Sequence, residues 1–239
     1  MHLSRLLSTF PPAPLPPVLR PELLLHAYRG GLFPMADPDD DDRIFWCAPD
    51  PRAVLPLGGL RVSRSLRQRL RRGTYAVTTD EAFDAVVAGC AEPAPGREQT
   101  WISDEIAWAY GLLHRLGHAH SVECWDASGD LAGGLYGVVL GGAFFGESMF
   151  SRSVDASKVA LVHLVERLRE GGFALLGVQM QTPHLERMGA VEVTREEYEA
   201  QLASAVHVVA DWHAGAAEDD PARRPRILDA EAPRGAPVR

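Results

Sequence analysis

Apolar residues recur at intervals of three and four along much of this chain, which predicts amphipathic helices. The strongest case is residues 155–172, where apolar side chains fall at 159, 161, 164, 165 and 168. Asp80 and Ser103 each precede a further periodic segment and suit the N-cap position, whereas Pro21 suits a first helical turn. We therefore expect helices at 21–29, 63–72, 80–92, 103–117 and 155–172, with two more between 182 and 202.

Short apolar and alternating segments predict the strands. One strand is expected in "TYAVTTD" (74–80) and one in "FALLGVQM" (173–180). Residues 119–150 contain three strands, of which the second and third form a hairpin at Gly141-Gly142. Residues 32–52 predict short strands joined by loops, and the acidic run 37–42 is expected to be a loop.

The order of these elements resembles that of the GNAT superfamily of N-acyltransferases, in which a bulge and a splayed pair of central strands form the acyl-donor cleft. The predicted fold class is therefore α+β, with a GNAT-like acyltransferase domain at 61–213. A small N-terminal α/β domain at 1–60 precedes it, and its first twenty residues are expected to be irregular because they are rich in proline. We expect the tail at 214–239 to be disordered. A likeness of fold does not establish function.

Composition narrows the class of protein. Hydrophobic residues make up 46% of the 239 residues and charged residues 23%, which supplies a sizeable core. No apolar run is long enough to cross a membrane and the N-terminus lacks the features of a signal peptide, so we expect a cytoplasmic protein without a membrane partner. Neither the three scattered cysteines nor the cluster of His114, His118 and His120 has metal-site spacing, so we expect no metal and no disulfide framework.

Charge is unevenly distributed. The net charge is −8, yet six arginines fall within residues 61–72. A helix would gather Arg64, Arg67 and Arg71 along one side, which suits phosphate binding. The alternative is an ordinary solvated helix face. The candidate RNA contacts in this segment are Arg64, Arg67, Arg69, Arg71 and Arg72.

Four segments in order along the chain resemble the leucyl/phenylalanyl-tRNA–protein transferase family. They are "AYRGGLFPM" (27–35), "FWCAPDPRAVL" (45–55), "GGLYGVVLGGAFFGESMFSRSVDASKVAL" (133–161) and "VQMQTPHLERMGA" (178–190). The resemblance implies transfer of Leu, Phe and sometimes Met from aminoacyl-tRNA to proteins that begin with Arg or Lys, which then enter the N-degron pathway. It implies no cofactor, because the aminoacyl ester is already activated.

The implied reaction is aminolysis of an ester, so the site must align two partners, stabilise an oxyanion and move a proton. The resemblance places Glu147 against the acceptor's Arg or Lys side chain and makes Gln179 the catalytic glutamine, which would orient the attacking amine. The alternative for Glu147 is a structural salt bridge to Arg152 or Lys158. The alternative for Gln179 is a buried, hydrogen-bonded amide.

The resemblance also implies two apolar sites. A pocket for the Leu or Phe side chain falls on Leu135, Phe144, Met149, Leu164, Leu168 and Leu176. A shelf for the terminal adenosine falls on Met35, Trp101 and Tyr110, with Met35 standing where the family often has Trp. For each pocket residue the alternative is an ordinary position in the core.

One position departs from the family pattern. Gly177 stands where the family has an aspartate, two residues before Gln179, so a catalytically weakened or retuned member is an alternative. The sequence also leaves open an acetyl-CoA-dependent GNAT N-acetyltransferase, a transferase that builds cell-wall peptide bridges and a non-catalytic RNA-binding module. The acetyltransferase would need a glycine-rich pyrophosphate loop before a long helix, and "SRSVDASK" lacks those glycines.

Overall fold

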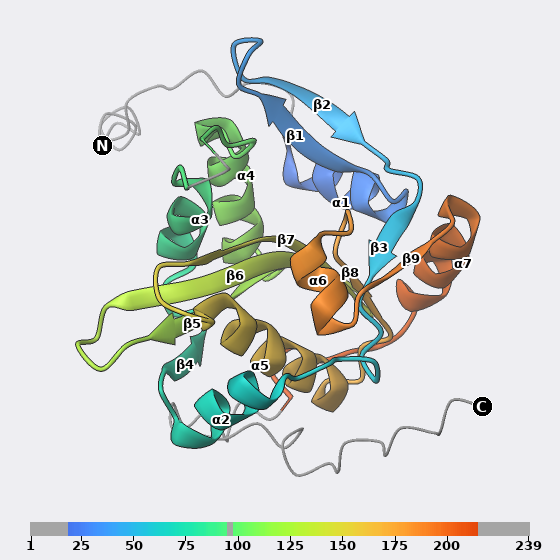
Figure 1. Cartoon of the computed structure of the whole chain (residues 1–239). Helices are drawn as coiled ribbons and strands as arrows, with labels where there is room; N and C mark the ends of the chain where they lie inside the picture. The colour runs from blue at the N-terminus through green and yellow to red at the C-terminus, as the bar shows by residue number, and fades with distance from the viewer. Residues whose placement is uncertain (1–18, 95–97, 215–239) are drawn as a thin grey trace, which may run out of the picture.

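The computed structural model describes residues 19–94 and 98–214, in which a seven-stranded mixed sheet lies between two layers of helices (Figure 1). The strand order is β4-β5-β6-β7-β8-β3-β9. All neighbouring strands are antiparallel except β7 and β8, which are parallel. The strands are β3 (Arg52–Val54), β4 (Ala76–Thr79), β5 (Ala119–Trp125), β6 (Leu131–Leu140), β7 (Ala143–Ser151), β8 (Leu175–Gly177) and β9 (Val191–Val193).

Helices cover both faces of this sheet and bury a separate apolar core on each. One core is formed with α1 (Pro21–Arg29), α3 (Phe83–Ala91), α4 (Asp104–Arg115) and α7 (Arg195–Ala205). The other is formed with α2 (Arg64–Arg72), α5 (Ala156–Glu170) and α6 (Pro183–Met188). A separate hairpin of β1 (Phe33–Asp37) and β2 (Arg43–Cys47) lies beyond the edge of the helical layer (Figure 1). The prediction of a mixed α and β fold is confirmed.

Several helix ends follow from local sequence. The Ser63 and Ser103 hydroxyls accept hydrogen bonds from the first turns of α2 and α4, and Pro21 opens α1. Gly73 ends α2 with a φ of 58°, a left-handed conformation that glycine adopts without a steric penalty. Residues 38–42, four of them Asp, form the turn of the β1–β2 hairpin, so the acidic run is a loop as expected except for its first residue, Asp37, which ends β1.

The prediction that Asp80 caps α3 is wrong. The helix begins at Phe83, and its N-cap residue is Ala82. The Asp80 carboxylate instead accepts hydrogen bonds from the Ser121 backbone N–H at 2.9 Å, from His120 Nδ1 at 2.8 Å and from Trp212 Nε1 at 2.8 Å. These tertiary partners outcompete the local capping position.

Strand β3 lies at 52–54, between β8 and β9 in the large sheet. The chain therefore enters this sheet before residue 60, where the N-terminal domain was expected to end. The division at residue 60 stays a prediction. The segments 1–18 and 215–239, which contain most of the expected irregular start and disordered tail, lie outside the described residues.

A bulge in the β6–β7 pair determines where the site forms. Tyr136 pairs with Ser148, whereas the next residue, Gly137, pairs with Gly146, so Glu147 is the extra residue. The parallel β7–β8 pairing ends nearby, at Phe145 opposite Gly177, which is also the last residue of β8.

Gly137→Ala tests this geometry. An added Cβ would overlap the carbonyl oxygen of Phe145, so a backbone must shift and the free energy of unfolding should fall by about 1–3 kcal/mol. Gly58→Ala is the matched control, because an added Cβ there meets no atom within 4 Å. Denaturant titration of both variants measures the effect, and equal stabilities would contradict this role of the bulge.

Candidate active site

Glu147 projects from the bulge into a buried polar cluster, and only 7% of its surface is exposed. Its Oε2 accepts hydrogen bonds from Gln179 Nε2 at 2.7 Å and from the Tyr110 hydroxyl at 2.9 Å. The Tyr110 hydroxyl is in turn 2.6 Å from that of Tyr28. No described residue donates a hydrogen bond to Oε1 of Glu147. The carboxylate is thus anchored through one oxygen, whereas the other is buried without a hydrogen-bond partner among the described residues.

Gln179 follows β8 and has a φ of 62°, which is uncommon for a residue with a side chain. Its carbonyl accepts a hydrogen bond from the Ala53 backbone N–H at 3.1 Å, so β3 holds the backbone here. The side-chain N–H group donates to Glu147, which turns the amide oxygen away from the carboxylate. The two residues expected to be catalytic are therefore in direct contact.

The surroundings of Glu147 set its acidity. Burial raises the pKa of Glu147 from 4.5 to about 7, although hydrogen bonds from Tyr28, Tyr110 and Gln179 and the positive charge of Arg52 lower it. A carboxyl group with this pKa can exchange a proton near neutral pH. That property suits a general base in an aminolysis reaction.

The alternative salt bridges of Glu147 do not form among the described residues. Arg152 pairs with Glu92 at 2.5 Å, and Lys158 pairs with Asp155 at 2.6 Å. Neither Arg152 nor Lys158 therefore forms a structural salt bridge with Glu147.

An apolar cavity of about 300 Å³ opens beside Glu147, where the β7–β8 pairing ends. Four of the six residues expected in the aminoacyl pocket line it, namely Leu135, Met149, Leu164 and Leu176. The other two, Phe144 and Leu168, are fully buried in the adjoining core and do not line it. Further lining residues that the sequence did not single out include Tyr136, Leu161, Val178 and Leu185.

His184 also lines this cavity, from α6. Its Nε2 is buried and makes no hydrogen bond to any described residue. Burial and the positive charges of Lys158 and Arg187 lower the pKa of His184, so its imidazole is neutral at pH 7. The cavity is therefore mostly apolar, with a carboxyl group and a neutral imidazole at its lining.

The three residues expected to form an adenosine shelf lie in different environments. Met35 and Trp101 are partly buried in adjacent segments, which are joined by the hydrogen bond from the Ala36 backbone N–H to the Trp101 carbonyl at 3.1 Å. Tyr110 is only 1% exposed, and its ring packs edge-on against Tyr136. The ring of Tyr110 therefore has no free face on which an adenine could stack. Its hydroxyl instead donates a hydrogen bond to Glu147.

The sequence matches the family model described as "Leucyl/phenylalanyl-tRNA protein transferase" over residues 54–203, and the model of that family's N-terminal domain over residues 18–50. The chain belongs to this family. The leucyl/phenylalanyl-tRNA–protein transferase of Rubrobacter xylanophilus is 58% identical over 190 residues, which are 80% of this chain and 96% of the relative. That of Maricaulis maris is 55% identical over 193 residues, which are 81% and 89%.

Similarity to solved structures is much weaker. The structure of L-PGS from Bacillus licheniformis has a TM-score of 0.39 and 12% identity, and the match covers 68% of this chain and 51% of that one. A similarity at this level bears on neither the fold nor the function of this chain.

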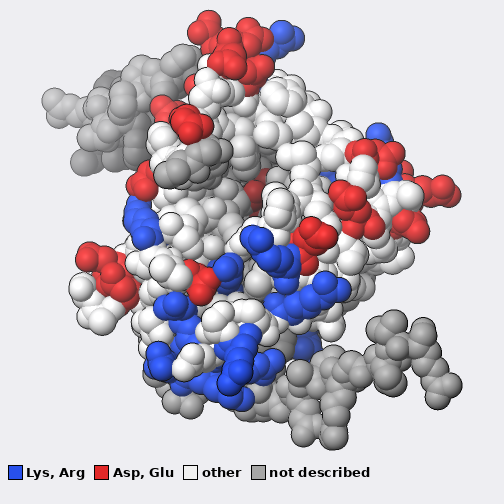
Figure 2. All heavy atoms as spheres, in the orientation of Figure 1, with Lys and Arg blue, Asp and Glu red and all other residues white. Residues whose placement is uncertain are grey.

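The basic residues gather on one end of this family member. Figure 2 shows Lys and Arg massed over the region of α2 and continuing toward α5 and α6, whereas acidic residues lie over the β1–β2 hairpin and α7. Arg64, Arg71 and Arg72 are exposed on α2, opposite the buried Leu66 and Leu70. A chain with net charge −8 thus presents a basic surface.

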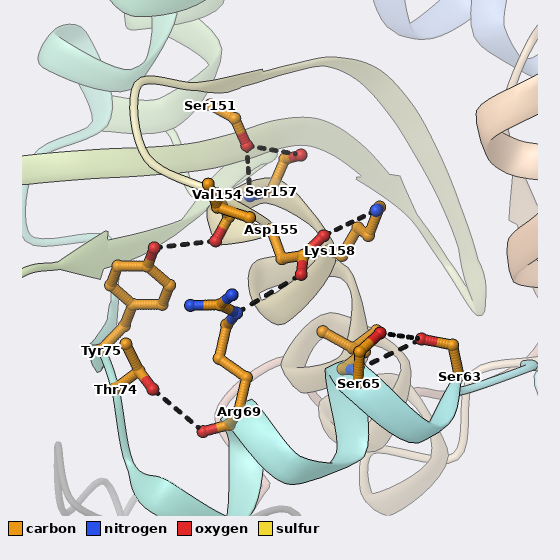
Figure 3. A network of polar contacts seen from close by, with 11 residues as sticks. Ser63, Ser65, Arg69, Thr74, Tyr75, Ser151, Val154, Asp155, Ser157 and Lys158 are labelled. Atoms are coloured by element: carbon orange, nitrogen blue, oxygen red, sulfur yellow. Dashed lines mark hydrogen bonds and ion pairs between the residues drawn. The ribbon is translucent and has the colours of Figure 1, made fainter.

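Arg69 of α2 forms an ion pair with the start of α5. Its Nε lies 3.3 Å from Asp155 Oδ2, and Lys158 Nζ binds the other oxygen of the same carboxylate (Figure 3). This bridge joins α2 to the first turn of α5. Since Lys158 also acts electrostatically on His184, positive charge continues from α2 to the cavity.

No three His, Cys, Asp or Glu residues of the described chain are grouped so that they could hold a metal ion. In the same residues, no helix combines the length and apolar character needed to cross a membrane.

Glu147→Gln tests the buried carboxyl group. Because the pKa of Glu147 is raised on folding, its ionisation destabilises the folded protein as pH rises from about 4.5 through about 7. The variant should therefore gain stability relative to the wild type between pH 5 and pH 8, by up to about 3 kcal/mol. Denaturant titrations at both pH values measure this, with the exposed Glu186→Gln as control. A wild type–variant difference that does not change with pH would contradict it.

Proposed function

We propose that this chain transfers a leucyl or phenylalanyl group from aminoacyl-tRNA to the N-terminus of proteins that begin with Arg or Lys. Membership of the family supports the transfer itself. The observation that carries the chemistry is the hydrogen-bonded pair of Glu147 and Gln179, beside an apolar cavity. The products would enter the N-degron pathway in the cytoplasm.

The reaction joins the acceptor's α-amine nitrogen to the ester carbonyl carbon and breaks the carbon–oxygen bond to the ribose. The amine loses one proton and the leaving ribose oxygen gains one, so no other reactant is needed. Gln179 would accept a hydrogen bond from the amine through its free oxygen. Glu147, whose pKa is about 7, would take the proton from the amine and return it to the ribose oxygen.

Glu147 would also select the acceptor. Among the residues that line the cavity it is the one acid, and its Oε1 accepts no hydrogen bond from a described residue. A cationic first side chain would bind this oxygen and favour the ionised carboxylate. Tyr110, assigned to the adenosine shelf from the sequence, would serve instead to hold Glu147.

The cavity would hold the Leu or Phe side chain of the donor. Its lining is mostly apolar apart from Glu147, His184 and a few small polar groups, as a site for an apolar side chain requires. The tRNA would approach over α2 and the first turn of α5, because both carry exposed or half-exposed basic residues. Met35 and Trp101 remain the candidates for contact with the terminal adenosine.

The fold-level part of the proposal is that the sheet is GNAT-like, with an N-terminal domain before residue 60. The end of the β7–β8 pairing at Phe145 and Gly177, beside the cavity, supports an acyl-donor cleft at this point. Binding of acetyl-CoA is less well supported, because the turn before α5 lacks the glycines of a pyrophosphate loop and its N-cap residue is Asp155. Because Gly177 stands where the family has an aspartate, a transferase with weakened activity or altered specificity is the alternative.

Transfer of labelled Leu from Leu-tRNA to short peptides tests the proposal. Peptides that begin with Arg or Lys should accept Leu, whereas an otherwise identical peptide that begins with Asp should not. Glu147→Gln should lower the rate at least about 100-fold, the scale of a lost general base.

An N-acetylated Arg peptide is the control, because its blocked amine cannot attack. Absence of transfer to every peptide, with uptake of an acetyl group from acetyl-CoA, would establish the acetyltransferase instead. Binding of tRNA without any transfer would indicate an RNA-binding module.

Leu164→Ala and Leu168→Ala form a matched pair within α5. Both side chains are almost completely buried, so each variant should lose about 2–5 kcal/mol of stability. Only Leu164 lines the cavity, so only its truncation should shift the preference from Leu-tRNA toward Phe-tRNA. The ratio of kcat/KM for the two donors measures this. An equal shift in both variants would show that the cavity does not hold the donor side chain.

Arg64→Gln combined with Arg71→Gln tests the RNA surface. Loss of two phosphate contacts should reduce the slope of log affinity for tRNA against log salt concentration by about two. Arg43→Gln, on the acidic hairpin, is the control and should leave the slope unchanged. A double variant with the wild-type slope would place the RNA elsewhere.

A further inference from the structure

Arg52 is a buried cation with an unusual set of contacts. It lies on β3 and is 3% exposed, with its guanidinium 4.7 Å from the ring centroids of both Phe33 and Tyr198. Its Nη2 is 3.5 Å from the Tyr198 hydroxyl, whereas Nε and Nη1 are buried and make no hydrogen bond to the described residues. A buried charge without a direct ion pair among the described residues is destabilising, so its presence needs a reason.

The backbone places Arg52 next to the catalytic pair. The following residue, Ala53, donates its N–H to the Gln179 carbonyl at 3.1 Å and accepts from the Val178 N–H at 3.0 Å. The Gln179 side chain then reaches Glu147. Cation–π contacts with two aromatic rings hold the guanidinium, which places the positive charge beside the site.

We propose that Arg52 is a positioning residue of this site, whose clamped positive charge keeps the neighbouring Glu147 carboxylate available as a proton acceptor. The effect of Arg52 on the ionisation of Glu147 is independent of the proposed function. Only the role of Glu147 as a proton acceptor in the reaction rests on that function. The groups that face Glu147 from the elements around it are mainly neutral at pH 7. They are the phenols of Tyr28, Tyr110, Tyr136 and Tyr198, the Gln179 amide and, across the cavity, the His184 imidazole.

Arg52 supplies the full positive charge in this group. Burial raises the pKa of Glu147, and the charge of Arg52 opposes that rise. Without the guanidinium, the carboxyl group would stay protonated over a wider pH range and could not accept a proton from an amine.

Gly177 has no side chain and so places no negative charge beside Arg52. A Cβ at this position would lie 3.2 Å from the Tyr198 hydroxyl, which is itself the hydrogen-bonding contact of Arg52. A carboxylate introduced here would enter the field of the guanidinium and neutralise it. Gly177→Asp should therefore act on Glu147 in the same direction as removal of Arg52, whereas the neutral Gly177→Asn, of nearly equal size, should not.

The test is a pH titration of Glu147 by NMR, in protein labelled with ¹³C at the glutamate side-chain carboxyl carbons. The Glu147 signal is assigned as the one that Glu147→Gln removes. We expect Arg52→Gln and Gly177→Asp each to raise the titration midpoint by about one pH unit or more. Arg52→Lys should preserve much of the wild-type value because it keeps the charge, and Gly177→Asn should remain at the wild-type midpoint.

The inference is overturned if the midpoint stays at its wild-type value in Gly177→Asp, or if Gly177→Asn raises it as much. The Gly177 pair retains Arg52 and its packing, so an unchanged midpoint in Gly177→Asp rejects the inference even if Arg52→Gln does not fold. A raised midpoint supports it together with the Arg52 variants, because a carboxylate at position 177 also repels Glu147 directly. Because the titration requires no substrate, failure of the protein to transfer Leu would reject the proposed function without affecting this result.

Discussion

Where the β7–β8 pairing ends, the hydrogen bond from Gln179 to Glu147 joins residues 32 positions apart and gives the site its geometry. It depends on three features of the backbone. The bulge opposite Gly137 turns Glu147 out of the strand pairing, the end of parallel pairing opens the cavity, and β3 holds the Gln179 backbone. A change in any one of these would separate the carboxylate, the amide and the apolar cavity.

The electrostatics of the site reflect a balance between stability and chemistry. A carboxyl group buried among tyrosines would be protonated and inert, whereas an exposed one would be a weaker base. Burial, three hydrogen-bonding side chains and the charge of Arg52 together hold the pKa of Glu147 at about 7. Both groups have buried atoms without hydrogen-bond partners among the described residues, which lowers the stability of the folded protein.

Features that depend on interactions between residues close together in the chain could be predicted from the sequence. The caps at Ser63 and Ser103 and the end of α2 at Gly73 follow from interactions within a few residues. The family resemblance selected Glu147 and Gln179, and the structure places them in contact.

Properties that depend on distant partners were not predictable. Leu164 and Leu168 share one helix and the same apolar pattern, but only the tertiary packing around them decides that Leu164 lines the cavity and Leu168 does not. Arg52 gave one signal, a charged residue at the start of an apolar strand, yet its aromatic clamp comes from Phe33 and Tyr198, which are remote in sequence.

The most direct test of the catalytic pair is the pH dependence of single-turnover Leu transfer to an Arg peptide. In the wild type, the rate should rise with pH with a midpoint near or below 7, and Glu147→Gln should lack this rise. The change in rate caused by titration of the acceptor amine should remain in both proteins. Identical pH profiles would contradict a role of Glu147 as the proton acceptor.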